Sequence, residues 1–470
     1  MTARNPRTGA LDHAFTAVDA AEVQATVAGL REGFGEWSAL SIEDRAGALL
    51  SLADALSRNA DTIASALEAD TGRRRIARLE VEGAIAGLRG WVAQADSLLP
   101  TGWQQGRSMP HLRHTAQFCP MGVVGVISPW NFPLTLSMID TVPALLTGCA
   151  VALKPSEVTP RFADPLETAI AEAGLGGVFQ ILRGDGATGA ALISAVDAVC
   201  FTGSVATGRK VYASAAAAMI PAFLELGGKD PLIVLEGADP EAASDAALRG
   251  SVLSTGQACQ SIERIYVART IAEDFVSRLK IKTEAVRLNH PDIRVGEVGP
   301  VIFDRQARIL QDHIDDAVFK GARVLTGGQV ENLDGGLYLR PTLITGVTHD
   351  MKVMREETFG PIMPVMVFDT VDEVVALAND TEFGLSAAVF GSTLEEAEAV
   401  GRCIDAGAIS LNDAALTSLF YEAEKHSFKL SGLGGSRMGP AGFQRFLKRK
   451  ALIANTARPV PLAAFAEDAG

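Results

Sequence analysis

Three polar side chains suited to chemistry on a carbonyl group stand in apolar or glycine-rich surroundings. Cys259 lies in SVLSTGQACQSIER, just before an expected strand, where backbone N–H groups could stabilise a thiolate or an oxyanion. Glu225 in FLELGGKDPLIVL is flanked by apolar residues, and we expect desolvation to raise its pKa and make it a base near neutral pH. Asn131 in SPWNFPL could donate to an oxyanion through its side-chain amide.

Each of these residues also has a simpler explanation. Cys259 could be a small buried hydrophobe, Glu225 a salt-bridged loop acid and Asn131 a helix cap. The sequence has no C-x-x-C and no H-E-x-x-H, so we expect neither a disulfide framework nor a metal site. We expect burial in apolar company, without a chemical role, for the other four cysteines, Cys119, Cys149, Cys200 and Cys403.

The elements that must position these side chains follow an α/β pattern. From about 120 to 235, short apolar runs alternate with helical stretches, which predicts a doubly wound, Rossmann-like, largely parallel sheet. Such sheets bind ligands at the carboxyl ends of their strands. A second alternating block begins after 250, and the first hundred residues are mostly helical. We predict a cofactor-binding domain over 1–101 and 121–226, a catalytic domain over 227–430, and oligomerisation strands over 102–120 and 450–462.

Composition limits the classes of partner. The chain has 470 residues and a net charge of −14, so it repels a phosphate backbone, and we expect no nucleic-acid partner. It has no apolar run of membrane-spanning length and no export signal at its start, which predicts a cytoplasmic protein without a membrane partner.

Six short motifs follow one another in a recognisable order. They are PWNFPL at 129–134, KPSE at 154–157, FTGS at 201–204, ELGGK at 225–229, GQACQS at 256–261 and EETFGP at 356–361. With these motifs the sequence resembles the aldehyde dehydrogenase superfamily. The resemblance implies that Cys259 attacks an aldehyde, that Asn131 holds the oxyanion, and that Glu225 activates the water that hydrolyses the thioester to a carboxylic acid. Relatives that acylate coenzyme A typically lack this glutamate.

The same resemblance implies a dinucleotide cofactor. Lys154, Ser156 and Glu157 end an expected strand and are implied to hold the adenosine ribose. A carboxylate there accepts bonds from two hydroxyl groups but repels a 2′-phosphate, which favours NAD, with NADP as the alternative. The other implied cofactor contacts are Trp130, Gly203, Ser204, Gly208 and Leu226, together with Glu357 and Phe359 at the nicotinamide ribose.

The stretch GDGATG at 184–189 matches the G-x-G-x-x-G fingerprint of dinucleotide-binding loops. The fingerprint also needs an acidic residue at the end of the next strand, and that strand ends in AVCFTGS. We therefore interpret the stretch as a glycine turn at the edge of the adenine pocket, with Gly186 in contact with the cofactor.

The sequence departs from the family pattern at two places. The P-F-G-G usually found ahead of the C-terminal S-G motif is replaced within EAEKHSFKLSG, and Lys448 stands where many hydrolytic members have a second glutamate. The substrate tunnel is expected to be lined by Phe132, Met138, Leu416 and Phe420, without a basic side chain for a second carboxylate.

These tunnel residues favour an apolar or aromatic aldehyde, with a semialdehyde as the alternative. Lys425 or His426 would contradict the first reading if either turned inward. Two other readings are a catalytically silent structural or binding homologue and a thiol esterase. The edge strands and the resemblance predict a homodimer or homotetramer.

Overall fold

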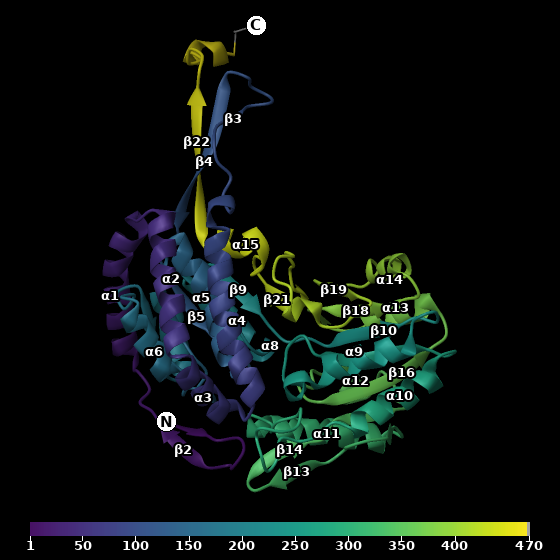
Figure 1. The fold of residues 1–470 in the computed structure, drawn as a ribbon. Helices are drawn as coiled ribbons and strands as arrows, with labels where there is room; N and C mark the ends of the chain where they lie inside the picture. The colour runs from purple at the N-terminus through teal and green to yellow at the C-terminus, as the bar shows by residue number, and fades with distance from the viewer. Residues whose placement is uncertain (468–470) are drawn as a thin grey trace.

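The structure is a computed structural model that describes residues 1–467, and its two largest sheets come from different parts of the chain (Figure 1). The first sheet has the order β21-β9-β8-β5-β6-β7, and all neighbours are parallel except β21 and β9. Its strands are β5 (Val123–Ile127), β6 (Ala150–Lys154), β7 (Phe179–Ile181), β8 (Ala198–Thr202), β9 (Ala222–Glu225) and β21 (Gly432–Leu433).

Helices separate successive strands of this sheet. Every residue of β5, β6 and β8 is buried, as expected for parallel strands that are covered on both faces. The helices between the strands are α5 (Pro133–Thr147), α6 (Ala163–Glu172), α7 (Gly186–Ala195) and α8 (Val205–Ala217). Four helices precede the sheet: α1 (Ala20–Ala39), α2 (Ile42–Arg58), α3 (Ala60–Thr71) and α4 (Arg74–Ala93).

The second sheet has the order β12-β15-β16-β11-β10-β18-β19 and is parallel apart from β12. Its strands are β10 (Asp230–Val234), β11 (Ile262–Ala268), β12 (Arg323–Val324), β15 (Thr342–Thr345), β16 (Ile362–Phe368), β18 (Ala387–Phe390) and β19 (Ile409–Leu411). Its helices are α9 (Pro240–Val252), α10 (Ala272–Glu284), α11 (Asp304–Phe319), α12 (Lys352–Arg355), α13 (Val371–Asn379) and α14 (Leu394–Gly401).

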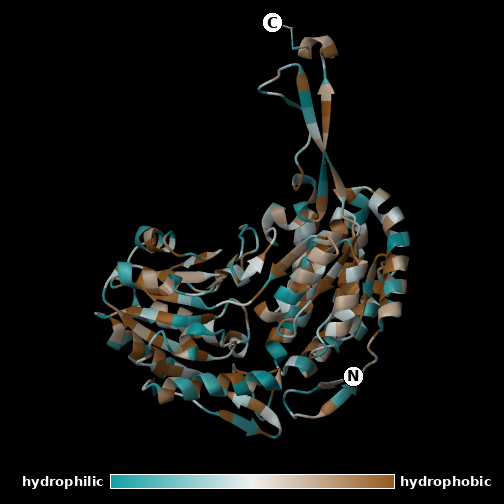
Figure 2. Ribbon diagram, turned by 180° about the vertical axis from the view of Figure 1, so that it is seen from behind, coloured by the Kyte–Doolittle hydropathy of each residue, from teal (hydrophilic) through white to brown (hydrophobic). Residues whose placement is uncertain are grey.

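Apolar side chains fill each half of the molecule separately, and brown strands lie inside teal-rich helices in Figure 2. One core cluster runs from the first helices to β9, while two others lie on β10, β11 and β16. The predicted fold, a doubly wound Rossmann-like unit followed by a second α/β unit, is confirmed. Among the described residues, no helix combines the length and apolarity needed to cross a membrane.

A three-stranded antiparallel sheet projects from the first half of the molecule (Figure 1). It consists of β3 (Gln104–Gln105), β4 (Leu112–Pro120) and β22 (Leu447–Asn455). The strands therefore fill only parts of the predicted ranges 102–120 and 450–462, and β22 begins three residues before the second range. Gly106 and Pro110 interrupt the first range, and Pro459 and Pro461 cannot donate backbone hydrogen bonds in the second.

The chain begins with a hairpin that the sequence patterns did not reveal. Its strands are β1 (Thr2–Arg4) and β2 (Leu11–Ala14). The Arg4 guanidinium donates to Gly335 O at 2.8 Å, and Arg7 donates to Asn289 O at 2.7 Å. The first residues therefore contact the second half of the molecule, while α1 to α4 pack on the first.

Two of the four cysteines expected to be buried are not. Cys149 and Cys200 are fully buried, whereas Cys403 is exposed and Cys119 is only partly buried. Cys119 lies on β4 of the projecting sheet, where both faces lack a covering helix, and Cys403 lies just beyond the end of α14. The apolar neighbours in sequence did not translate into burial at these positions.

Two adjacent leucines of α2 test how much this packing contributes to stability. Leu49 has no exposed surface, while Leu50 is 40% exposed. We expect Leu49→Ala to lower the free energy of unfolding by about 2–5 kcal/mol, because it leaves a cavity in the core. Leu50→Ala, the matched control, should change it by no more than about 0.5 kcal/mol. Denaturant unfolding of the two variants measures the difference, and equal losses would contradict the packing described.

Candidate active site

The three residues selected for carbonyl chemistry come together between the two sheets. Asn131 follows β5, Glu225 is the last residue of β9, and Cys259 lies just ahead of β11. The Asn131 Nδ2 donates to Gln257 O at 3.0 Å, which joins the end of β5 to the Cys259 loop. An added Cβ on Gly228, three residues after Glu225, would lie 2.7 Å from Cys259 O. The first sheet and the second sheet therefore each supply part of one site.

The loop before Cys259 has an unusual backbone. Ser254, Thr255 and Gly256 have φ values of 58°, 61° and 64°, a left-handed run that is costly for the two non-glycine residues. The buried side chain of Gln257 supports the loop, because its Oε1 accepts from Ile302 N–H at 2.9 Å and its Nε2 donates to Pro300 O at 3.3 Å. This support fixes the backbone that leads into Cys259, the predicted nucleophile.

Two charged residues of α4 and its cap hold Asn131 in place, and sequence analysis missed both. The buried Arg73 guanidinium donates to Asn131 O. Glu80 Oε2 accepts from Leu134 N–H at 3.2 Å and Thr135 N–H at 3.1 Å, at the start of α5. Burial raises the pKa of Glu80 to about 7. No local motif marks these residues, because their partners lie more than 50 positions away.

The Cys259 thiol is a neutral group in this environment. Burial raises its pKa to about 12, and Glu225 and Asp230 add to the increase, whereas Lys425 and Arg437 oppose it. A thiolate is the reactive form of cysteine, so positive charge near the sulfur matters for nucleophilic attack.

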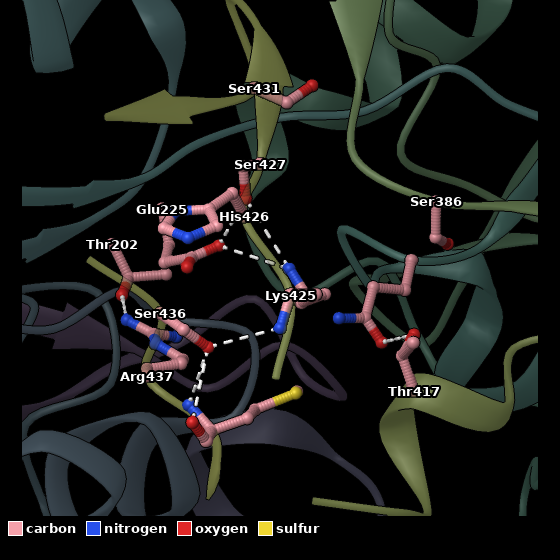
Figure 3. A network of polar contacts seen from close by, with 12 residues as sticks. Thr202, Glu225, Ser386, Thr417, Lys425, His426, Ser427, Ser431, Ser436 and Arg437 are labelled. Atoms are coloured by element: carbon pink, nitrogen blue, oxygen red, sulfur yellow. Dashed lines mark hydrogen bonds and ion pairs between the residues drawn. The ribbon is translucent and has the colours of Figure 1, made fainter. Parts of the chain in front are cut away.

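The prediction that Glu225 has a raised pKa is wrong. Burial does raise the pKa, but Lys425, Arg437, Arg445 and a hydrogen bond from Ser427 together lower it below the ordinary carboxyl value. The Ser427 hydroxyl donates to Glu225 Oε2 at 2.8 Å, and Lys425 Nζ lies 3.6 Å from the same oxygen (Figure 3). Glu225 is therefore an ionised carboxylate at neutral pH.

Lys425 turns inward, contrary to the expectation of a site without a basic side chain. Its side chain is only 4% exposed, and in Figure 3 it points toward Glu225 and Ser427. The nearby Arg437 donates to Thr202 Oγ1 at 2.7 Å and Asp140 Oδ2 at 3.0 Å. The segment that replaces the usual P-F-G-G thus places a cation beside the predicted base.

The expected tunnel residues occupy different environments. Leu416 and Phe420 lie on the loop that contains Thr417, whose hydroxyl donates to Gln260 Oε1 at 2.6 Å, next to Cys259. Phe420 is exposed, and Phe132 lies beneath the Arg73 guanidinium, 5.0 Å from its ring centre. Met138 is buried in the core cluster of the first half. Their contact with substrate stays a prediction.

The adenosine end of the predicted cofactor site is assembled around Lys154. Its Nζ donates to Gly184 O at 2.8 Å and lies 3.5 Å from Glu157 Oε2. This contact brings the KPSE motif against the start of GDGATG. Ser156 is buried, and its Oγ accepts from Val158 N–H at 3.2 Å, whereas the Glu157 side chain is 42% exposed. Glu157 is accessible to a ligand.

The GDGATG stretch forms a local turn. Asp185 caps α7 by accepting from Ala187 N–H at 2.8 Å, and an added Cβ on Gly184 would collide with Thr188. Gly186 has no atom within 4 Å of an added Cβ, so open space adjoins it. Its contact with the adenine end of a cofactor stays a prediction.

The predicted pyrophosphate residues meet at the start of α8. Ser204 Oγ accepts from Thr207 N–H at 3.3 Å and caps the helix directly after Gly203. An added Cβ on Gly208 would lie 2.6 Å from Leu226 Cδ2, so only glycine allows this helix to approach Leu226. Free N–H groups at a helix start suit a phosphate anion.

The predicted nicotinamide end is fixed by the EETFGP loop. Phe359, at φ 54°, packs edge-to-face on Trp130 with ring centres 5.4 Å apart. Glu357 Oε1 accepts from Gly228 N–H at 3.1 Å. Burial and the nearby Glu263 raise the pKa of Glu357 to about 8. A partly buried carboxyl group that a backbone N–H holds in place suits ribose hydroxyls, so these residues fit a nicotinamide dinucleotide.

Glu263 holds this loop, and sequence analysis did not select it. Its two carboxylate oxygens accept from Thr358 N–H and Phe359 N–H, both at 2.7 Å, and it also pairs with Lys229 at 2.8 Å.

Lys448, by contrast, is exposed and pairs with Cys119 in the projecting sheet.

Comparison with known proteins agrees with this arrangement. The model of the aldehyde dehydrogenase family matches residues 1–452. A Mycolicibacterium smegmatis protein, named provisionally as an NADP-dependent succinate-semialdehyde dehydrogenase, is 35% identical over 431 residues, which are 91% of this chain and 83% of that protein.

Solved structures give the same result. PutA of Anabaena variabilis, provisionally named an aldehyde dehydrogenase, is 49% identical with a TM-score of 0.96, and the match covers 98% of this chain and 99% of that one. An indole-3-acetaldehyde dehydrogenase solved with NAD+ is 30% identical with a TM-score of 0.92, over 97% and 93% of the two chains. The chain belongs to the aldehyde dehydrogenase family, and it is an oxidoreductase that acts on aldehydes with NAD or NADP.

A single added methyl group tests the nicotinamide end of the site. The Cβ of Gly227→Ala would collide with the Glu357 carboxyl group, so we expect roughly tenfold weaker binding of NAD, the loss of about one hydrogen bond. Gly47→Ala, in α2 with nothing within 4 Å, should bind NAD as the wild type does. Calorimetric titration without aldehyde measures both, and unchanged binding by Gly227→Ala would remove Glu357 from the cofactor site.

Proposed function

We propose that this aldehyde dehydrogenase forms carboxylic acids through a thioester on Cys259, with Asn131 as the oxyanion donor and Glu225 as the base. The observation that carries the proposal is the meeting of these residues between the two sheets, with Asn131 bonded to the Cys259 loop. The ionised state of Glu225 supports its role, since a base must be unprotonated before the reaction.

The first half of the reaction makes and then oxidises a covalent adduct. The Cys259 thiol loses its proton to solvent, its sulfur bonds to the aldehyde carbon, and the carbonyl oxygen becomes an oxyanion. The Asn131 Nδ2 and the Cys259 N–H donate to that oxyanion and stabilise it. A nicotinamide cofactor held at Glu357 and Phe359 would supply the acceptor for the hydride of that carbon, and the oxyanion closes to the carbonyl of a thioester.

The second half releases the acid. Glu225 takes a proton from a water molecule whose oxygen bonds to the thioester carbon, and the carbon–sulfur bond breaks. The products are a carboxylic acid and the Cys259 thiolate. Transfer to a thiol such as coenzyme A would not require this base, so Glu225 supports hydrolysis over acyl transfer.

For the cofactor, we propose NAD ahead of NADP. The accessible carboxylate of Glu157 supports this preference, since it would repel a 2′-phosphate.

The six-stranded sheet would form the cofactor-binding domain over 1–101 and 121–226, and 227–430 the catalytic domain. The projecting strands would join copies into a homodimer or homotetramer, which their exposed Trp103, Leu452 and Ile453 support.

For the substrate, we propose an apolar or aromatic aldehyde. The exposed Leu419, Phe420 and Tyr421, on the loop bonded to Gln260, support this class. The alternative is a semialdehyde. Lys425 does turn inward, as that alternative requires, but its charge faces Glu225 at 3.6 Å and is not open to a second carboxylate, so the apolar class stays ahead. The relative named for succinate semialdehyde is consistent with that alternative.

A panel of aldehydes tests the activity, the substrate class and the cofactor together. We expect NAD reduction with the highest kcat/KM for apolar or aromatic aldehydes, and lower values for semialdehydes and with NADP. Cys259→Ala should lose turnover roughly 10³-fold or more, both as dehydrogenase and as esterase, while NAD still binds. The absence of NAD(P) reduction with every aldehyde would favour a silent homologue, and ester hydrolysis alone would favour an esterase.

Removal of the base should separate the two halves of the reaction. We expect Glu225→Gln to slow deacylation by about 10²–10⁴-fold, the usual contribution of a general base, and to leave the first hydride transfer much faster. Stopped-flow absorbance of the reduced cofactor should then show a burst close to one equivalent per active site. A steady state equal to that of the wild type would contradict the role of Glu225.

A further inference from the structure

Lys425 is a buried cation whose position the proposed steps do not yet use. Its Nζ lies 3.6 Å from Glu225 Oε2 and 3.4 Å from the Ser427 hydroxyl, and its backbone N–H donates to Ser436 Oγ at 3.2 Å. A charged side chain is rarely this buried unless it is paired, and its pairing here is with the predicted base. Figure 3 shows this network.

The contacts to Glu225 fall on one oxygen. Ser427 and Lys425 both approach Oε2, and within residues 1–467 no hydrogen bond reaches Oε1. An asymmetric clamp of this kind fixes the carboxylate plane and leaves the lone pairs of Oε1 for a water molecule.

Apart from Lys425, the groups that face Cys259 do not neutralise the negative charge of a Cys259 thiolate. Arg437 and Arg445 share the single carboxylate of Asp140, so these three groups together carry one net positive charge. Arg437 also donates to Thr202. On the other side, Glu225 and Asp230 both raise the pKa of the Cys259 thiol, and Tyr421 carries no charge at neutral pH. Without Lys425, the two carboxyl groups would oppose ionisation of the thiol. Only the net positive charge of Arg437, Arg445 and Asp140 would then favour it.

A role in binding a substrate anion fits the contacts less well. The positive charge of Lys425 is already engaged by Glu225, and an anion bound there would lie beside that carboxylate. Like charges at such separation in a buried site are costly. The geometry therefore favours the protein's own groups as the partners of Lys425.

We propose that Lys425 is a positioning residue that clamps Glu225 through Oε2, keeps it ionised, and compensates the negative charge of Cys259 during attack. This inference rests on the proposed roles of Cys259 and Glu225. It makes the unusual segment EAEKHSF part of the machinery for the reaction, in addition to any contact that its neighbours make with substrate.

The test compares Lys425→Met and the polar but neutral Lys425→Gln with Lys425→Arg, after thermal unfolding has shown which variants fold. In the wild type, Lys425 lowers the pKa values of both Cys259 and Glu225, so its removal should raise both. We expect alkylation of Cys259 by iodoacetamide, without NAD or aldehyde, to be about tenfold slower at each pH below the midpoint, which corresponds to a rise of about one unit in that midpoint.

The acid limb of thioester hydrolysis should move to higher pH in the same neutral variants, and Lys425→Arg should restore both profiles in large part. Lys429→Met is the matched control. Lys429 lies four residues away and pairs with Asp405 at 3.0 Å, and its removal should leave both profiles unchanged.

Unchanged midpoints in a folded neutral variant would overturn the inference. If such a variant only raised KM for anionic aldehydes, Lys425 would be a substrate contact instead. Failure of the proposed function looks different, because mass spectrometry would then show turnover without modification at Cys259 in the wild type. If neither neutral variant folds, a Lys425→Arg profile that differs from the wild type by a full unit would still contradict a purely electrostatic role.

Discussion

A thiol and an ionised carboxylate that share one partly buried site require nearby positive charge, and the path of the chain after the second sheet meets this requirement. Residues beyond β19 return to the first sheet, where Gly432 of β21 pairs with Glu225 at the end of β9. Pairing at that point brings Lys425, Ser427 and Arg437 to the carboxylate of the proposed base. One short antiparallel strand therefore decides the electrostatics of the site.

Buried ion pairs rarely add net stability, because desolvation offsets most of their attraction, so their placement needs another reason. Asp140 of α5 accepts from both Arg437 and Arg445, and Arg437 also reaches Thr202 at the end of β8. These contacts tie the returning segment to the first sheet. Replacement of one of these charged residues would leave a buried charge without its partner. The contacts therefore specify one position for the returning segment, beyond any stability that they add.

Sequence patterns were most informative where the chemistry is local. The strands β5, β6 and β8 are almost wholly apolar runs, and the six motifs mark the ends of strands and the loops between them. The pKa direction of Glu225 could not be predicted in this way, because its neighbours Phe223 and Leu224 indicate desolvation alone. The opposing Ser427 is 202 residues away in the sequence. Arg73, Glu80 and Glu263 were missed for the same reason.

The two site glutamates show how one buried environment produces opposite behaviour. Glu225 faces Lys425 and Arg437, and its pKa falls below the ordinary carboxyl value despite burial. Glu357 shares a single Lys229 with Glu263 and Asp230, and its pKa rises to about 8. The first group is thus ready to accept a proton, whereas the second holds one at neutral pH and can donate to a hydroxyl oxygen. Divergent pKa values of paired carboxyl groups are a mark of divided roles, and here they separate the proposed base from the proposed ribose contact.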